Sequence, residues 1–111
     1  MRTYDGGTHP GAELAHAVLS QGREPAVVPA AADRAGVLGA FAAALSFPAH
    51  FGRNLDALND CLWDWSERLT GPTTLVWVQA ETLDGPTADA VTTILRDTEA
   101  ASPHLAVVVL R

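Results

Sequence analysis

The sequence has one cysteine, no lysine and no long apolar run. Cys61 has no partner for an internal disulfide, and its position between Leu58 and Leu62 predicts a buried small hydrophobic residue rather than a reactive thiol. No apolar stretch approaches the roughly 20 residues of a membrane-spanning helix, and no N-terminal basic segment leads into an apolar run with a small-residue cleavage site. We therefore expect a soluble, cytoplasmic protein.

Positive charge is also scarce, because thirteen acidic residues face seven basic ones and the formal net charge is −6. This balance repels phosphate backbones, so we expect no nucleic acid and no membrane among the partners and favour a basic protein instead. All seven basic residues are arginine and alanine is abundant, which indicates a GC-rich bacterial genome. At 111 residues the chain fits one domain, residues 1–111, with a core that needs no disulfide or metal.

Motifs for cofactors and catalysis are missing as well. His9, His16 and His104 have no spacing to cysteine or carboxylate residues that resembles a metal site. The chain has neither a glycine-rich phosphate loop nor a recognisable pair of nucleophile and base. We therefore expect no cofactor, no metal and no catalytic residues.

The apolar pattern alternates between short strands and helices. Strands are predicted over 26–28, 73–78 and 104–110, and helices over 33–48, 54–69 and 86–102. An N-terminal extension, residues 1–24, is predicted to hold a short helix from Thr8 to Val18, packed on the domain and stopped by Gly22. This order predicts an α/β fold with a small three-stranded parallel sheet packed by helices.

The helix predicted after Asn54, which suits a helix N-cap, carries an unusual row of charge. Asp56, Asp60 and Asp64 recur every four residues, so they share one face, where like charges cost roughly 0.2–0.5 kcal/mol per pair. The other face is an apolar stripe made of Leu55, Leu58, Leu62, Trp65 and Leu69. One reading is a solvated face on which Arg53 and Arg68 pair with neighbouring aspartates. The other is a binding surface.

The stretch from Phe47 to Trp65 resembles a known family. Its core, Phe51-Gly52-Arg53-Asn54-Leu55-Asp56-Ala57-Leu58 followed by Asp60-Cys61-Leu62, is similar to the signature of the barstar family of intracellular ribonuclease inhibitors. The similarity is weaker from Ala26 to the C-terminus and absent before it. It implies a barstar-like fold and a monomeric inhibitor that forms a 1:1 complex with an extracellular-type microbial guanyl-specific ribonuclease, barnase-like, whose active-site face is basic.

The resemblance also implies a partner-binding surface on the loop, the acidic helix and the last helix. The positions carried over are His50, Gly52, Asn54, Leu55, Asp56, Asn59, Asp60, Trp63, Trp65 and Asp97. In the family, the aspartate at the Asp60 position occupies the phosphate pocket of the ribonuclease. His50 and Asn59 replace two aromatic residues of the family's prototype, and Asp97 replaces a glutamate. The cognate enzyme is therefore expected to differ from barnase itself.

Two other classes of function stay open. The three aspartates could do acid–base work or share a Mg²⁺ ion in an enzyme. Alternatively, the chain could be a non-inhibitory interaction module that uses the same acidic face to bind another basic protein or a toxin domain.

Overall fold

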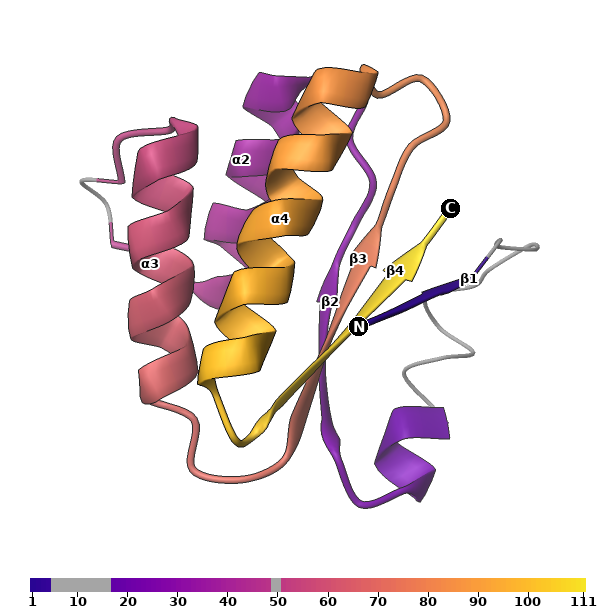
Figure 1. Ribbon diagram of the computed structural model, residues 1–111, viewed down its shortest axis with the longest axis vertical. Helices are drawn as coiled ribbons and strands as arrows, with labels where there is room; N and C mark the ends of the chain where they lie inside the picture. Colours follow the sequence, from indigo (N-terminus) through magenta and orange to yellow (C-terminus); the bar gives the residue numbers. More distant parts are fainter. Residues whose placement is uncertain (5–16, 49–50) are drawn as a thin grey trace.

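The computed structural model describes residues 1–4, 17–48 and 51–111, and Figure 1 shows a sheet with three helices packed side by side over one of its faces. The elements are β1 Arg2–Tyr4, β2 Glu24–Val28, α2 Arg34–Leu45, α3 Leu55–Glu67, β3 Thr73–Val78, α4 Gly85–Ala101 and β4 Leu105–Leu110. The three predicted strands and the three helices predicted after Ala26 are present, with ends within about three residues of those expected. None of the described helices combines the length and apolarity that crossing a bilayer requires.

The sheet has four strands in the described part of the chain, all parallel, in the order β1-β4-β3-β2. The prediction of three strands was therefore wrong. The missed strand is β1, whose Arg2 and Tyr4 pair with Val108 and Leu110 of β4. Three residues with no apolar alternation carry too little pattern to predict a strand, and here pairing with the edge of β4 defines it.

Most of the N-terminal helix predicted between Thr8 and Val18 lies outside the described residues. Residues 17–20 are helical, and Val18 is buried with 4% of its surface exposed. Gly22 follows with a φ of +76°, a left-handed conformation that glycine adopts without steric cost. The predicted stop at Gly22 is therefore confirmed.

Each long helix begins with a side chain that accepts a hydrogen bond from its first turn. The Gly36 N–H donates to Asp33 Oδ1 at 2.8 Å in α2, and the Ala57 N–H donates to Asn54 Oδ1 at 2.7 Å in α3. The cap predicted at Asn54 is confirmed. In α4 the cap is Asp84, whose Oδ2 accepts from the Thr87 N–H at 2.9 Å. This bond to the charged form holds the pKa of Asp84 below its ordinary value of 3.8.

The lowered pKa of Asp84 predicts how stability depends on pH. The ionised cap contributes fully above the unfolded-state pKa, and its contribution is lost as pH falls through the folded-state pKa. The parent should therefore melt above an Asp84→Asn variant at pH 6, and the gap should close as pH falls below 3.8. Paired thermal melts from pH 6 to pH 2 measure this gap. A gap that stays constant over that range would contradict the prediction.

The helices cover one face of the sheet with the main core. Leu75 and Trp77 of β3 point to that face and pack with Leu58 and Leu62 of α3. Trp77 is fully buried, and its ring centroid lies 6.2 Å from that of Phe41 in α2. The opposite face carries a smaller cluster of Val76, Val108 and Leu110. The core therefore fixes one side of α3 and leaves the other side free.

Candidate functional site

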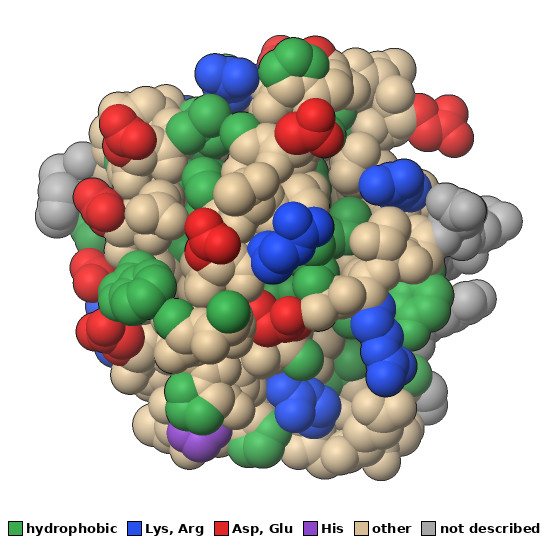
Figure 2. Space-filling model, viewed as in Figure 1, with side chains coloured by type: hydrophobic (Ala, Val, Ile, Leu, Met, Phe, Trp, Pro, Cys, Tyr) green, Lys and Arg blue, Asp and Glu red, His purple; other side chains and the backbone are tan. Residues whose placement is uncertain are grey.

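The exposed side of α3 carries a continuous row of carboxylates. Asp56, Asp60 and Asp64 are all exposed, as the spacing predicted, while Leu58 and Leu62 on the opposite side have no exposed surface. Glu67 is exposed too, three residues after Asp64, and sequence reasoning missed it although its spacing follows the same face. We call these four residues the acidic face of α3. Figure 2 shows acidic side chains gathered along the edge of the molecule where α3 lies.

The negative charge of this face is not paired internally. Arg53 and Arg68 were the candidates for neutralising it, yet the one salt bridge within the described residues joins the Met1 amine to Glu99. Arg53 has a left-handed φ of 50°. Its guanidinium extends towards α2, where Nη1 lies 3.9 Å from the position that a Cβ on Gly39 would occupy. The reading in which these arginines pair with the aspartates is therefore wrong for the described part of the chain.

An exposed tryptophan lies within the acidic face. Trp63 follows Asp60 by three residues and precedes Glu67 by four, so all three share one side of the helix. Its side chain is 43% exposed, and its indole Nε1–H donates to Glu67 Oε1 at 2.6 Å. This hydrogen bond fixes the ring against the helix. The surface therefore presents a held aromatic side chain surrounded by carboxylates.

The other predicted residues of α3 differ in what they can offer a partner. Asn59 is exposed and follows Asp56 by three residues. Leu55 and Trp65 are only partly exposed and pack against the core. They can therefore show an edge to a partner while their main role is to hold α3 on the sheet.

Residues 51–54, directly before α3, are organised around its N-cap. Gly52 and Asn54 are exposed, and the Asn54 Nδ2–H donates to the Gly52 carbonyl at 3.5 Å while its Oδ1 caps the helix. Phe47 and Phe51 stack edge to face with ring centroids 5.2 Å apart, which joins the two ends of the loop. The predicted contact His50 lies outside the described residues.

Asp97 comes from α4, which packs beside α3 (Figure 1). It is exposed and lies one helical turn before Ala101, on the same side of α4. Ala101 in turn lines a groove of about 230 Å³ together with Trp63, Ser66, Glu67, Leu69 and residues 102–104. The end of α4 therefore lies beside the C-terminal end of the acidic face. Asp97 lies one helical turn before this point of contact.

Cys61 departs from its prediction. It is partly exposed rather than buried, because it follows Asp60 on the flank of the helix between the acidic face and the apolar stripe. Its partial burial raises the pKa of the thiol, and the carboxylates of Asp64 and Asp60 raise it further, while Arg68 lowers it. The thiol is therefore held in its protonated form, which is the weaker nucleophile.

The spacing of the aspartates does not suit one cation shared by all three. Asp56 and Asp64 are eight residues apart, about 12 Å along a helix axis, so their carboxylates do not meet at one ion. In the part of the chain that the structure describes, no group of three His, Cys, Asp or Glu side chains is placed to hold a metal. The arrangement suits contact with a large surface better than chelation.

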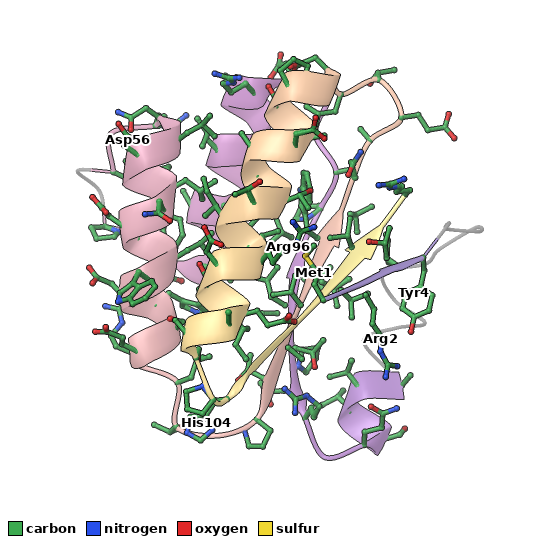
Figure 3. All side chains as sticks on the ribbon, in the orientation of Figure 1. Met1, Arg2, Tyr4, Asp56, Arg96 and His104 are labelled. Carbon is green, nitrogen blue, oxygen red and sulfur yellow. The ribbon has the colours of Figure 1, made fainter. Side chains whose placement is uncertain are left out.

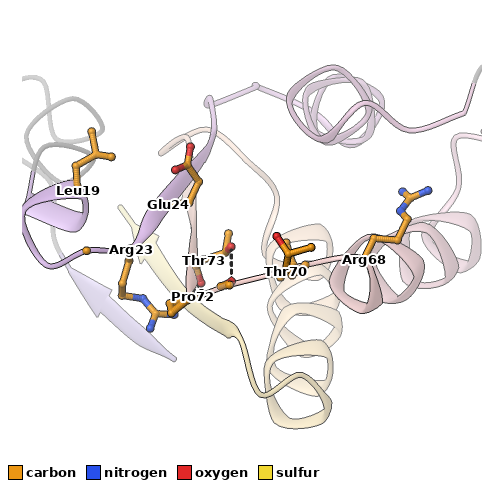
Figure 4. A pocket seen from close by; sticks show the side chains of 10 residues that line it. Leu19, Arg23, Glu24, Arg68, Thr70, Pro72 and Thr73 are labelled. Atoms are coloured by element: carbon orange, nitrogen blue, oxygen red, sulfur yellow. Dashed lines mark hydrogen bonds between the residues drawn. The ribbon is translucent and has the colours of Figure 1, made fainter.

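A second cleft, of about 620 Å³, opens at the end of the sheet where β2 and β3 begin (Figure 4). Arg23 lines it, but its guanidinium already makes three hydrogen bonds: Nε donates to Thr74 Oγ1 at 2.8 Å, and Nη2 donates to the Thr73 carbonyl at 2.9 Å and to the His104 carbonyl at 3.0 Å. Arg23 therefore joins three strand ends, and the exposed polar side chains that the cleft offers a ligand are those of Glu24, Arg68 and Thr70.

Comparison with protein families gives one match. The family model described as Barstar (barnase inhibitor) matches residues 26–110, which is more than half of the chain and includes all of α3 and α4. The match begins within β2, so β1 and residues 17–25 lie outside it. This agrees with the resemblance noted from Ala26 onward. No curated protein matches the chain.

Proposed function

The chain belongs to the barstar family, and from that premise we propose that it inhibits a barnase-type, guanyl-specific microbial ribonuclease by placing the acidic face of α3 in the enzyme's active site. The observation that carries the proposal is the row of exposed carboxylates that no arginine pairs with in the described residues. This row lies inside the matched region. Asp60 occupies its centre, where the resemblance places the residue that fills the phosphate pocket.

The physical basis is mimicry of phosphate by a fixed carboxylate. An active site that binds RNA presents cationic donors, and a carboxylate makes short, charge-assisted hydrogen bonds with such donors. Asp60 is held on a helix whose other side is buried through Leu58 and Leu62, so little conformational entropy is lost on binding. A ribonuclease bound in this way cannot bind RNA.

The other proposed contacts come from α3, the loop before it and α4. Asp56 and Asn59 precede Asp60 on exposed positions of α3, Trp63 follows one turn later, and Asp97 is exposed on α4, which packs beside α3. Gly52 and Asn54 supply the ordered start of the helix, with His50 as the further loop contact that the resemblance implies. Leu55 and Trp65 contribute partly exposed edges. We propose a 1:1 complex of this surface with one enzyme molecule.

Association should depend on salt, because the acidic face and the net charge of −6 attract a basic enzyme over a distance. Raising NaCl from about 0.01 M to 0.5 M shortens the Debye length from about 30 Å to below 8 Å. We expect the association rate constant to fall by about tenfold or more, with a much smaller change in the dissociation rate constant. Stopped-flow mixing measures both. Equal association rates at the two salt concentrations would contradict electrostatic steering by this face.

The decisive test is residual RNA cleavage by barnase and a panel of actinobacterial guanyl-specific ribonucleases, each titrated with this protein. We expect cleavage by the cognate enzyme to fall linearly to zero at a 1:1 ratio. Barnase should be a weaker target, because His50 and Asn59 replace aromatic contacts of the family's prototype. Full activity of every enzyme at equimolar inhibitor would contradict the proposal and favour the non-inhibitory module that binds another basic protein or toxin domain.

A further inference from the structure

The groove at the C-terminal end of the acidic face combines an exposed tryptophan with an exposed carboxylate. It lies between two parts of the chain far apart in sequence, the last turn of α3 and the turn between α4 and β4. Figure 3 shows His104 in that turn, beyond the ends of both helices. The groove is thus continuous with the proposed ribonuclease surface, because Trp63 lines it, and it extends from Trp63 towards the C-terminal end of α3, away from Asp60.

The groove is lined by four polar side chains, those of Ser66, Glu67, Ser102 and His104, and by the apolar surface of Trp63, Leu69, Ala101 and Pro103. Its aromatic wall is Trp63, 43% exposed and held by the hydrogen bond from its Nε1–H to Glu67 Oε1. Glu67 is exposed and its second carboxylate oxygen has no partner among the described residues. The Ser66 hydroxyl is already used, since it donates to the Trp63 carbonyl at 2.8 Å. Leu69 and Pro103 add apolar surface.

Glu67 and Trp63 together favour a positively charged group as the occupant of the groove. An anion would meet the carboxylate of Glu67 with Asp64 only three residues away. A purely apolar side chain would cover Glu67 without pairing it, which leaves a buried charge uncompensated. A guanidinium group suits both the indole of Trp63 and the carboxylate of Glu67, because it stacks on an indole face and bonds to a carboxylate. The methylene stem of an arginine also suits the apolar surface of the groove.

We propose that this groove receives an arginine side chain of the bound ribonuclease, which stacks on Trp63 and pairs with the free oxygen of Glu67. The inference rests on the proposed function and adds a specificity contact to it. Trp63 and Glu67 then select, among basic ribonucleases, those with an arginine at the matching edge of the active-site face. The contact also supplies aromatic area that Asn59 no longer provides.

The first test compares inhibition constants for the enzyme that the protein inhibits best in the panel. Trp63→Ala should raise the inhibition constant by about tenfold, and Glu67→Gln, which keeps an acceptor for the indole, by several-fold. Tyr4→Ala is the matched control, since Tyr4 is 45% exposed and Figure 3 places it on the opposite edge of the molecule from Asp56. It should inhibit like the parent.

The outcomes separate the two proposals. If Trp63→Ala inhibits like the parent while Asp60→Ala does not, the groove proposal is wrong and the inhibitor proposal stands. If the parent inhibits no ribonuclease, the inhibitor proposal fails and a second experiment decides the chemistry of the groove.

That second experiment follows the indole N–H signal of Trp63 in ¹⁵N-labelled protein by NMR during titration with N-acetylarginine amide. The uncharged control is N-acetylcitrulline amide, which has nearly the same shape. We expect a saturable shift with the arginine compound only, reduced in Glu67→Gln, and weaker shifts with N-acetyllysine amide. Equal shifts with arginine and citrulline would refute a cation site at Trp63.

Discussion

Replacing Asp60 with alanine will weaken inhibition of the cognate ribonuclease more than any other single change on α3. We expect a loss of at least about 2 kcal/mol, roughly 30-fold in the inhibition constant, which is the size that marks a binding hot spot. The reason is that the cationic donors of the enzyme would be left buried without a partner, which costs more than the lost contact alone. Titration of RNA cleavage with parent and variant measures the effect.

Matched carboxylates on the same surface provide the controls. Asp56→Ala and Asp97→Ala should each cost less than Asp60→Ala, because they lie at the margins of the proposed contact. Asp60→Asn keeps the shape and one acceptor oxygen without the charge, so it separates charge from geometry. All of these positions are exposed, and the variants should melt close to the parent. If Asp60→Ala, Asp56→Ala and Asp97→Ala all inhibit like the parent, the site inferred from the family is wrong.

The fold could be predicted where the chain's signals are local. The residues of β3, Thr73–Val78, form an apolar, β-branched run between breakers, and the strand has the predicted ends. Asp33 and Asn54 were identifiable as caps because their side chains bond only three residues ahead. β1 could not be predicted, since its three residues become a strand only by pairing with β4 at the other end of the chain.

The candidate site also has features that the sequence predicts and features that depend on contacts between distant segments. The acidic face follows from helical periodicity alone, because one side of α3 is apolar and the other is charged. The failure of Arg53 to pair with it could not be foreseen, because the side chain's direction depends on a left-handed backbone and on the nearby surface of α2. The groove beside Trp63 needs two segments that are more than thirty residues apart, so no sequence spacing indicates it.

Loss of a buried leucine beneath the acidic face should have a large effect on the stability of the protein. Leu58→Ala should lower the free energy of unfolding by about 2–5 kcal/mol, because Leu58 has no exposed surface and its removal leaves a cavity between α3 and the sheet. For a domain of this size, the melting temperature should fall by roughly 10 °C or more. Urea and thermal unfolding measure both quantities.

The neighbouring residue supplies the control for Leu58→Ala. Asn59→Ala, on the exposed side of the same turn, should change the free energy of unfolding by less than about 0.5 kcal/mol. At a temperature where Leu58→Ala remains folded, its inhibition constant should stay within about twofold of the parent, since Leu58 points away from the acidic face. A stable Leu58→Ala variant would contradict the packing described here. A folded variant that no longer inhibits would mean that binding depends on the rigidity of α3 as well as on its carboxylates, because a helix free to shift would lose the entropic advantage of a fixed Asp60.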